Sequence, residues 1–340
     1  MINEVYQLTS PRYIDVTFED LPIERDKVII RPLNMSICKA DQRYYQGSRP
    51  KKVLNQKLPM ALIHECIAQV EYDPTGTYAV GSLVIPIPNT PVEDDPVIAE
   101  NYLRSSKFRS SGFDGFMQDY VSMPADRVVP VNGSVNPNVA AFAELISVCT
   151  HMLTRMDRIA HDRRDSVGIW GDGNIGFITA LLLKSTHPET KVTILGRNYD
   201  KLSYFSFTDD RVQIDEVPED LMFDHCIECV GGAGAESAIN QMIDHINPEG
   251  TIALSGVSET NVPINTRMIL EKGLRMYGSS RSGKADFEKT VKFLEEDPNA
   301  HYLENLVGAV CDIHSISDIH EAFNKDLSLR LGKTILQWNI

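Results

Sequence analysis

The sequence lacks the features that mark membrane, secreted and nucleic-acid-binding proteins. No uninterrupted apolar run reaches the roughly 18 residues that a transmembrane helix needs. Residues 1–15 contain no basic-then-apolar signal pattern, so we expect a cytoplasmic protein. Basic residues are the minority, with 33 Lys and Arg against 47 Asp and Glu and a net charge of -14. Nucleic acids and anionic membrane surfaces repel so acidic a protein, and neither is an expected partner.

The cysteine content also argues against a disulfide-rich scaffold. Only six cysteines occur in 340 residues, and they are scattered along the chain. This distribution favours free thiols or a metal ligand over a disulfide framework. Cys226 and Cys229 form a C-x-x-C pair, but no second pair accompanies it. Alternation on a buried strand explains this pair better than a metal site does.

The length and the hydrophobic pattern indicate two domains of roughly 150 residues each. Residues 1 to about 135 contain short strand candidates at 27–31, 66–71 and 82–86, separated by Gly and Pro, which indicates a β-rich module. A helix is predicted from Pro137 towards Met156.

The pattern of predicted elements changes in the middle of the chain. Strand candidates at 167–170, 191–195, 223–230 and 250–257 alternate with helical segments, which favours a doubly wound parallel sheet. Two amphipathic helices around Val291 and Ile319 and a closing strand at 332–338 return to the first module. We therefore predict an α/β fold in which residues 151–279 form a cofactor domain inserted into a β-rich domain of residues 1–150 and 280–340.

A glycine-rich turn joins the first strand of this middle segment to its helix. Its sequence is Gly171-Asp172-Gly173-Asn174-Ile175-Gly176. The first glycine of such a turn permits the bend, the second lets the backbone approach a pyrophosphate, and the third lets the helix pack against the strand. The free N–H groups at the helix start attract phosphate. In this strand-turn-helix context, the pattern predicts a dinucleotide site.

The end of the next strand favours NADP(H) over NAD(H). NAD sites usually carry Asp or Glu there, which binds the ribose 2′-hydroxyl. This chain instead has Gly196 followed by Arg197, with Lys201 nearby. Glycine leaves room for the 2′-phosphate of NADP(H), and Arg197 can pair with that phosphate. A solvated Arg197 without a ligand is the alternative.

Four residues are candidate zinc ligands: Cys38, His64, Glu65 and Glu144. They offer sulfur, nitrogen and oxygen, and three protein ligands with an open position are the arrangement of a catalytic zinc. Their spacing does not form a local zinc motif, however. A buried Cys, a structural His and a helix-surface Glu are each common, so these residues alone leave the question open.

These residues and several longer runs resemble the zinc-containing medium-chain dehydrogenase/reductase family, in its sorbitol-dehydrogenase-like branch. The similar runs span nearly the whole chain and lie at 36–41, 58–65, 80–84, 115–121, 124–129, 228–232 and 332–334. The resemblance implies a GroES-like catalytic domain with one catalytic zinc and a Rossmann domain that binds NADP(H). It implies Cys38, His64 and Glu144 as the main ligands and Glu65 as a fourth or exchanging ligand. Asp41 would be the acceptor that orients His64.

Further runs at 35–45, 98–103, 109–112 and 278–283 are similar to the family members that reduce D-ribulose 5-phosphate to D-ribitol 5-phosphate. Those members use NADPH and zinc and serve CDP-ribitol and poly(ribitol phosphate) wall teichoic acid synthesis. The resemblance implies a Lewis-acid zinc, a homodimer and a cytidylyltransferase as a candidate partner. Arg281 would lie near the nicotinamide. Candidates for the substrate phosphate are Arg43, Arg49, Arg104 and Arg109, with Lys51 and Lys52 beside them.

Three departures from the broader family stand out. Ile63 precedes the His-Glu pair, where many members carry Gly. Ala40 stands where many members have the Ser or Thr of a proton relay, so we expect the proton to arrive through water or Glu65. Residues 89–111 lack the four clustered cysteines of a structural-zinc lobe, so we predict only one zinc.

Two alternative functions are open. An NAD-dependent polyol dehydrogenase for unphosphorylated substrates would be expected to carry an acid at position 196 and fewer arginines near the zinc. A non-catalytic, NADPH-binding regulatory protein would be expected to have lost zinc ligands, and all four candidates are present here.

Overall fold

The computed structural model describes residues 1–340, which form two compact units. One unit comprises Met1–Ser147 and Ser282–Ile340, and the other comprises Val148–Arg281. The second unit is therefore an insertion in the first. Helix α4 (Ala143–Ile159) carries the chain across the first boundary. None of the helices is both long enough and apolar enough to cross a bilayer.

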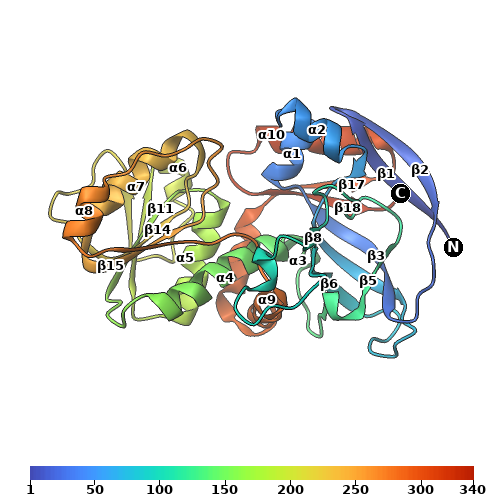
Figure 1. Ribbon diagram of the computed structural model, residues 1–340, viewed down its shortest axis with the longest axis horizontal. Coiled ribbons are helices and arrows are strands. Elements are labelled where there is room, and N and C mark those ends of the chain that lie inside the picture. Colours follow the sequence, from blue (N-terminus) through green and yellow to red (C-terminus); the bar gives the residue numbers. More distant parts are fainter. The chain divides into compact units, whose positions relative to one another are not determined.

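The first unit is built on a seven-stranded sheet that combines both ends of the chain. The strand order is β10-β6-β5-β3-β18-β17, and β9 also pairs with β3. The C-terminal β18 pairs antiparallel with β3 and parallel with β17, so red strands lie beside a blue one in Figure 1. Two smaller sheets have the orders β2-β1-β4 and β7-β8. The strands are β1 (Ile2–Ser10), β2 (Tyr13–Asp20), β3 (Lys27–Ser36), β4 (Met60–Ala61), β5 (Glu65–Tyr72), β6 (Leu83–Pro86), β7 (Asn89–Thr90), β8 (Lys107–Phe108), β9 (Val121–Pro124), β10 (Val128–Pro130), β17 (Val307–Ile313) and β18 (Lys333–Trp338).

Short helices complete the first unit. They are α1 (Lys39–Tyr45), α2 (Lys51–Lys57), α3 (Pro137–Ala140), α9 (Lys284–Glu296), α10 (Ile316–Ser328) and the 3-10 helices η1 (Glu100–Tyr102), η2 (Ala125–Arg127) and η4 (Pro298–Leu306). Helix α10 buries Ile319 and Phe323, and the Phe323 ring stacks on Tyr45 with centroids 4.3 Å apart. The contact holds α10 against α1, the helix that directly follows Cys38.

The single helix predicted from Pro137 towards Met156 is wrong. The chain forms α3 and α4 with a break between them. At the break, the Phe142 N–H donates to the Val139 carbonyl only three residues back, which tightens the turn. No Gly or Pro marks this position, so the pattern of apolar residues alone did not reveal it.

The second unit contains one six-stranded, entirely parallel sheet with the order β13-β12-β11-β14-β15-β16. Numbered within the unit, this is 3-2-1-4-5-6, the order of a doubly wound dinucleotide-binding sheet, and the predicted fold class is confirmed. The strands are β11 (Ser166–Trp170), β12 (Lys191–Gly196), β13 (Asp210–Gln213), β14 (Phe223–Glu228), β15 (Ile246–Leu254) and β16 (Arg275–Gly278). The helices are α5 (Asn174–Thr186), α6 (Tyr199–Leu202), η3 (Gly232–Gly234), α7 (Ala235–Asp244) and α8 (Thr266–Glu271).

Candidate metal centre and cofactor loop

The register of three adjacent strands assembles a polar cluster in the first unit. Opposite Ser36 of β3, Glu65 lies on β5 and Ile335 lies on β18. Strand β3 ends at Ser36, and Cys38, two residues later, is the N-cap of α1. The Ile37 N–H donates to the Thr334 carbonyl at 3.1 Å. The start of β18 is thereby held next to Cys38.

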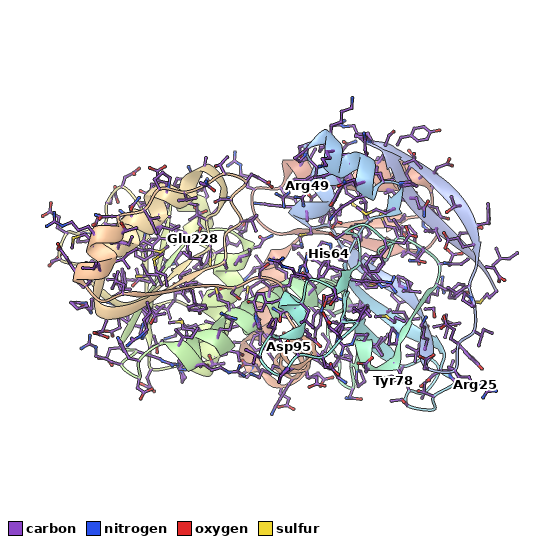
Figure 2. All side chains as sticks on the ribbon, in the orientation of Figure 1. Arg25, Arg49, His64, Tyr78, Asp95 and Glu228 are labelled. Atoms are coloured by element: carbon purple, nitrogen blue, oxygen red, sulfur yellow. The ribbon has the colours of Figure 1, made fainter.

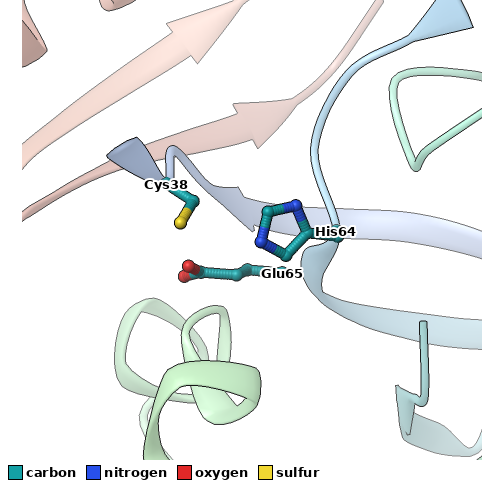
Figure 3. Close-up of side chains that lie close together, drawn as sticks. All are labelled: Cys38, His64 and Glu65. Atoms are coloured by element: carbon teal, nitrogen blue, oxygen red, sulfur yellow. The ribbon is translucent and has the colours of Figure 1, made fainter. Parts of the chain in front are cut away.

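Cys38, His64 and Glu65 form the centre of this cluster. Their sulfur, nitrogen and carboxylate oxygen atoms all lie within 4.8 Å of one another. In Figure 3, a ring nitrogen of His64 and the Glu65 carboxylate face the Cys38 sulfur. His64 is 6% exposed and Glu65 is 0% exposed. Cys38 is half-buried. A thiol, an imidazole and a carboxylate that converge in this way are the donor chemistry of a zinc site.

The spacing of these atoms fits a zinc ion. Two atoms bonded to a tetrahedral zinc at about 2.0–2.3 Å lie about 3.3–3.5 Å apart, so donor atoms that are all within 4.8 Å of one another need to close in by at most roughly 1.5 Å. Glu65 Oε2 is buried and accepts no hydrogen bond. Buried carboxylate oxygens are normally satisfied, and a metal ion would supply the missing partner.

Asp41 organises the loops around His64. Its buried carboxylate accepts hydrogen bonds from the Cys38 N–H at 3.1 Å, the Ile63 N–H at 3.1 Å and the Ser110 hydroxyl at 2.7 Å. Burial raises the pKa of Asp41, but His64 and these hydrogen bonds lower it below its ordinary value. Asp41 Oδ1 lies 3.6 Å from His64 Nδ1, which is longer than a hydrogen bond. Asp41 therefore lies on the His64 side of the cluster, where the resemblance expects an orienting acceptor.

The pKa of His64 is set by its burial and by the neighbouring Asp41 and Cys38. Burial lowers the pKa of His64, but the negative charges of Asp41 and Cys38 raise it well above its ordinary value. The ring therefore lies in a strongly negative environment. A cation between His64, Cys38 and Glu65 would be attracted by the same field.

The backbone at Ile63 adopts a conformation that favours glycine. Its φ is 72°, in the left-handed region that a β-branched residue rarely adopts. The conformation is held from three sides: the N–H donates to Asp41, the carbonyl accepts the Phe116 N–H at 2.7 Å, and the side chain is fully buried. The strained residue directly precedes His64 and sets the direction in which the imidazole leaves the backbone.

Glu144 lies in the first turn of α4 and is 7% exposed, but it is not among the three residues whose donor atoms converge. Burial and the Glu65 charge raise the pKa of Glu144 to about 7, against the opposing effect of His64. The structure therefore groups Glu65, rather than Glu144, with Cys38 and His64.

Lys333 is a member of this cluster that the sequence analysis missed. Its Nζ donates to Glu65 Oε1 at 2.9 Å, and both side chains are buried. Burial lowers the pKa of Lys333, but the charges of Glu65 and Cys38 raise it above its ordinary value. A lysine at the start of a closing strand gives no sequence signal of its own, because only the β18–β3–β5 register reveals its partner.

The glycine-rich turn of the second unit follows β11 at the carboxyl edge of the sheet. Because β11 lies between β12 and β14, the turn stands where the strand order reverses, the usual place of a dinucleotide. Helix α5 begins at Asn174 with Gly173 as its N-cap. A Cβ on Gly176 would lie 1.9 Å from the Gly171 carbonyl oxygen, so only glycine permits this packing.

Glu228 secures the neighbouring loops of the same edge. It ends β14, is 1% exposed, and is labelled in Figure 2. Its carboxylate accepts the N–H groups of Val230, Gly231 and Gly256 at 2.6–2.8 Å. The loops after β14 and β15 are thus tied together by one buried side chain.

The predicted cofactor side chains lie near the next strand end. Gly196 is the last residue of β12, Arg197 is exposed, and Lys201 lies in α6. Asp172 of the glycine-rich turn accepts the N–H groups of Arg197 and Asn198, a contact that the sequence analysis did not anticipate. Arg281 ends the unit with a positive φ of 59°.

The four arginines predicted for a substrate phosphate have different surroundings. Arg43 lies on α1, and Arg49 lies over the Tyr44 ring at 5.0 Å. Arg104 is exposed on a loop. Arg109 donates to the carbonyls of Asp114 and Ser122 and lies over two phenylalanine rings, so its own loop already occupies it.

Comparison with known proteins assigns the two parts of the chain to one class. Residues 24–133 match the family described as "Alcohol dehydrogenase GroES-like domain", and residues 197–296 match "Zinc-binding dehydrogenase". With the fold and the donor set above, these matches define a zinc-containing medium-chain dehydrogenase/reductase, and the predicted resemblance is confirmed.

Full-length relatives narrow the assignment. Ribulose-5-phosphate reductase of Bacillus spizizenii is 55% identical, with 100% of both chains covered. Ribulose-5-phosphate reductase 1 of Staphylococcus aureus is 52% identical, with 99% of both covered. The crystal structure of S. aureus TarJ in complex with NADPH matches with a TM-score of 0.90 and 46% identity over 100% of both chains. The chain belongs to the family of ribulose-5-phosphate reductases.

Proposed function

We propose that this protein reduces D-ribulose 5-phosphate to D-ribitol 5-phosphate with NADPH and one zinc ion. The observation that carries the proposal is the convergence of the half-buried Cys38 with the buried His64 and Glu65 in a chain of this family. Those residues would hold the zinc, and Glu144 is a further buried carboxylate for it. A zinc ion bound there supplies a Lewis acid for the ketose carbonyl.

The protein's own groups prepare this site. Asp41 holds the backbone on both sides of the ligands, through Cys38 and Ile63. Lys333 balances the charge of Glu65, so that the cluster is not left with an uncompensated buried carboxylate. Ala40 has no hydroxyl, and we propose that water or Glu65 delivers the proton to the product oxygen.

For the cofactor, we propose that the turn from Gly171 to Gly176 binds the pyrophosphate of NADPH. Gly173, Asn174 and Ile175 offer backbone N–H groups there. Arg197 and Lys201 would bind the 2′-phosphate, which the absence of an acid at position 196 favours. Arg281 is a further candidate for a cofactor contact.

For the substrate phosphate, we propose Arg43 and Arg49 in preference to Arg104 and Arg109. Both follow Cys38 closely and belong to α1 or the turn after it. A guanidinium group suits a phosphate because it can donate two parallel hydrogen bonds. Arg109 is the weakest candidate, because two backbone carbonyls already accept from it.

The biological setting belongs to the same proposal. The product would pass to a cytidylyltransferase for CDP-ribitol and poly(ribitol phosphate) wall teichoic acid synthesis. A cytoplasmic enzyme is expected, because the reduced cofactor and sugar phosphates are cytoplasmic metabolites. A homodimer is the form that the family resemblance implies. Size-exclusion chromatography with light scattering measures the oligomeric state.

A cofactor-oxidation assay tests the proposed activity. NADPH and NADH are each supplied with ribulose 5-phosphate or ribulose, with and without a chelator, and the product is identified by mass spectrometry. We expect rapid NADPH oxidation with the phosphorylated ketose, ribitol phosphate as product, and loss of activity on chelation. NADH oxidation with ribulose at equal efficiency would instead support the unphosphorylated polyol dehydrogenase. NADPH binding without turnover would support the regulatory protein.

A further inference from the structure

Asp172 is an unexpected residue in a turn that would face a pyrophosphate, because a carboxylate there repels the ligand. The structure shows that its side chain is turned to the neighbouring strand end. Asp172 Oδ2 accepts the N–H of Arg197 at 3.0 Å and the N–H of Asn198 at 2.9 Å. Both hydrogen bonds are charge-assisted and therefore stronger than neutral ones. The turn after β11 is thus tied to the turn after β12.

The same side chain limits which residue can stand at position 196. A Cβ built on Gly196 would lie 2.7 Å from Asp172 Cβ and 3.0 Å from both Asp172 Oδ2 and Leu202 Cδ2. Real Cβ atoms essentially never approach another heavy atom below 3.0 Å. An acid that accepts from the ribose of NADH therefore has no room at position 196 while Asp172 is in place.

The hydrogen-bond network of Asp172 extends to the short helix α6, which contains Lys201. The Asn198 side chain accepts the Lys201 N–H at 3.2 Å and caps α6. One carboxylate thereby supports the backbone of Arg197 directly and that of Lys201 through Asn198. Both hydrogen bonds of Asp172 come from backbone N–H groups, so its role is to position the turn that holds Arg197 and Asn198.

We propose that the pair Asp172 and Gly196 sets the preference for NADPH over NADH. Asp172 is the positioning residue: it fixes the turn that presents Arg197 to the 2′-phosphate, and its volume excludes an acid from position 196. The inference rests on the proposed function insofar as NADPH is the cofactor. The inference adds that Asp172 enforces the preference for NADPH over NADH.

The test measures dissociation constants for NADPH and NADH from the fluorescence of the bound reduced nucleotide. The proteins are the wild type, Asp172→Ala, Asp172→Asn, Gly196→Asp and the double variant Asp172→Gly/Gly196→Asp. Asp172→Ala should weaken NADPH binding roughly tenfold more than NADH binding, since it removes hydrogen bonds to a charged group. Asp172→Asn should keep most of the preference, because its amide oxygen can accept the same N–H groups.

The two Gly196 variants test the exclusion of volume. Gly196→Asp alone should lose NADPH affinity without gaining NADH affinity. The double variant should bind NADH at least roughly tenfold more tightly than Gly196→Asp does, because the new acid then has space. Thermal unfolding of each protein checks that it is folded, and if Asp172→Ala does not fold, Asp172→Asn and the double variant decide the question.

Several results would overturn the inference. An unchanged ratio of the two dissociation constants in Asp172→Ala would remove the positioning role. A stronger NADPH preference in Asp172→Asn would mean that the Asp172 charge opposes the 2′-phosphate. Tight NADH binding by Gly196→Asp alone would remove the exclusion of volume. A wild-type preference for NADH would instead contradict the proposed function itself.

Discussion

The metal cluster of the first unit and the cofactor turn of the second are built in opposite ways. The cluster uses side chains from residues 38, 64, 65 and 333, which meet only through strand register. The turn uses the backbone of six consecutive residues and the end of the adjacent strand. Removal of one partner of a buried ion pair leaves the other charge uncompensated, which is strongly destabilising. In the turn, several backbone N–H groups contribute to one binding site, so the loss of one side chain changes less. Substitutions in the cluster should therefore cost more than substitutions around the turn.

Loss of the Cys38 sulfur should have the largest effect. Cys38→Ala should abolish stoichiometric zinc and lower kcat/KM by more than about 1,000-fold, since the Lewis acid contributes several kcal/mol to the reaction. Zinc is measured by mass spectrometry of the purified protein and activity by NADPH oxidation. Cys311→Ala, a half-buried thiol outside the cluster, is the matched control. A zinc-free but fully active Cys38→Ala protein would show that the cluster is not catalytic.

Loss of the buried ion pair between Lys333 and Glu65 should have the second-largest effect. Lys333→Met leaves a buried carboxylate unpaired and should lower the free energy of unfolding of the metal-free protein by about 3–5 kcal/mol. Lys333→Arg keeps the charge and should lose less. Chemical denaturation with and without zinc measures both effects, with the exposed Lys325→Met as control. Equal stability of Lys333→Met and the wild type would mean that the ion pair contributes nothing to the fold.

Substrate recognition should respond to Arg43 or Arg49 more moderately. Removal of the guanidinium that binds the phosphate should raise KM for ribulose 5-phosphate roughly 10- to 100-fold, the cost of hydrogen bonds to a charged group. The same variant should leave the efficiency with unphosphorylated ribulose unchanged. Steady-state kinetics of Arg43→Ala, Arg49→Ala and the exposed Arg104→Ala with both ketoses distinguish the candidates. A uniform loss with both ketoses would indicate a structural role.

On the cofactor side, Arg197→Ala should weaken NADPH binding by about tenfold and leave NADH binding nearly unchanged, because only NADPH carries the 2′-phosphate. Titration of nucleotide fluorescence gives both dissociation constants. Arg267→Ala, which removes an exposed arginine of α8, serves as the control. If NADH binding fell equally, Arg197 would not be reading the phosphate.

The smallest effect at neutral pH should come from His225 of the second unit, whose contribution to stability depends on pH. Burial and the neighbouring His161 lower the pKa of His225 to about 4. The unfolded chain, with a His pKa near 6.5, binds the proton first, so His225 contributes full stability above about pH 6.5. That contribution is lost as the pH falls towards 4. Denaturation at a series of pH values should show a shallower loss for His225→Gln than for the wild type, and parallel curves would contradict the assignment.

The cofactor turn could be predicted from the sequence more fully than the metal cluster could. The glycine-rich turn and the residues at the end of the next strand were identified because they are contiguous and their spacing has a direct backbone meaning. The doubly wound parallel sheet of the second unit was also predicted, because alternating strands and helices leave few topologies. Asp172 was not singled out, because its partners are backbone N–H groups 25 and 26 residues away.

The metal cluster was less accessible. Cys38 lies far along the chain from the adjacent pair His64 and Glu65, and family resemblance rather than spacing joined them. The partner of Lys333 is revealed only by the register of β18, β3 and β5. The position of Ile63 was noted from the sequence, but its strain is revealed only by its backbone angle. No Gly or Pro marks the break between α3 and α4, so the pattern of apolar residues did not predict it.

Zinc K-edge X-ray absorption on the purified protein tests the central claim most directly. With zinc held by Cys38, His64 and Glu65, the spectrum should show one sulfur at about 2.3 Å and nitrogen or oxygen ligands at about 2.0–2.2 Å. Any zinc that added metal restores to the Cys38→Ala protein should show no sulfur scatterer. A zinc shell without sulfur in the wild type, or a wild type that binds no zinc, would contradict the account.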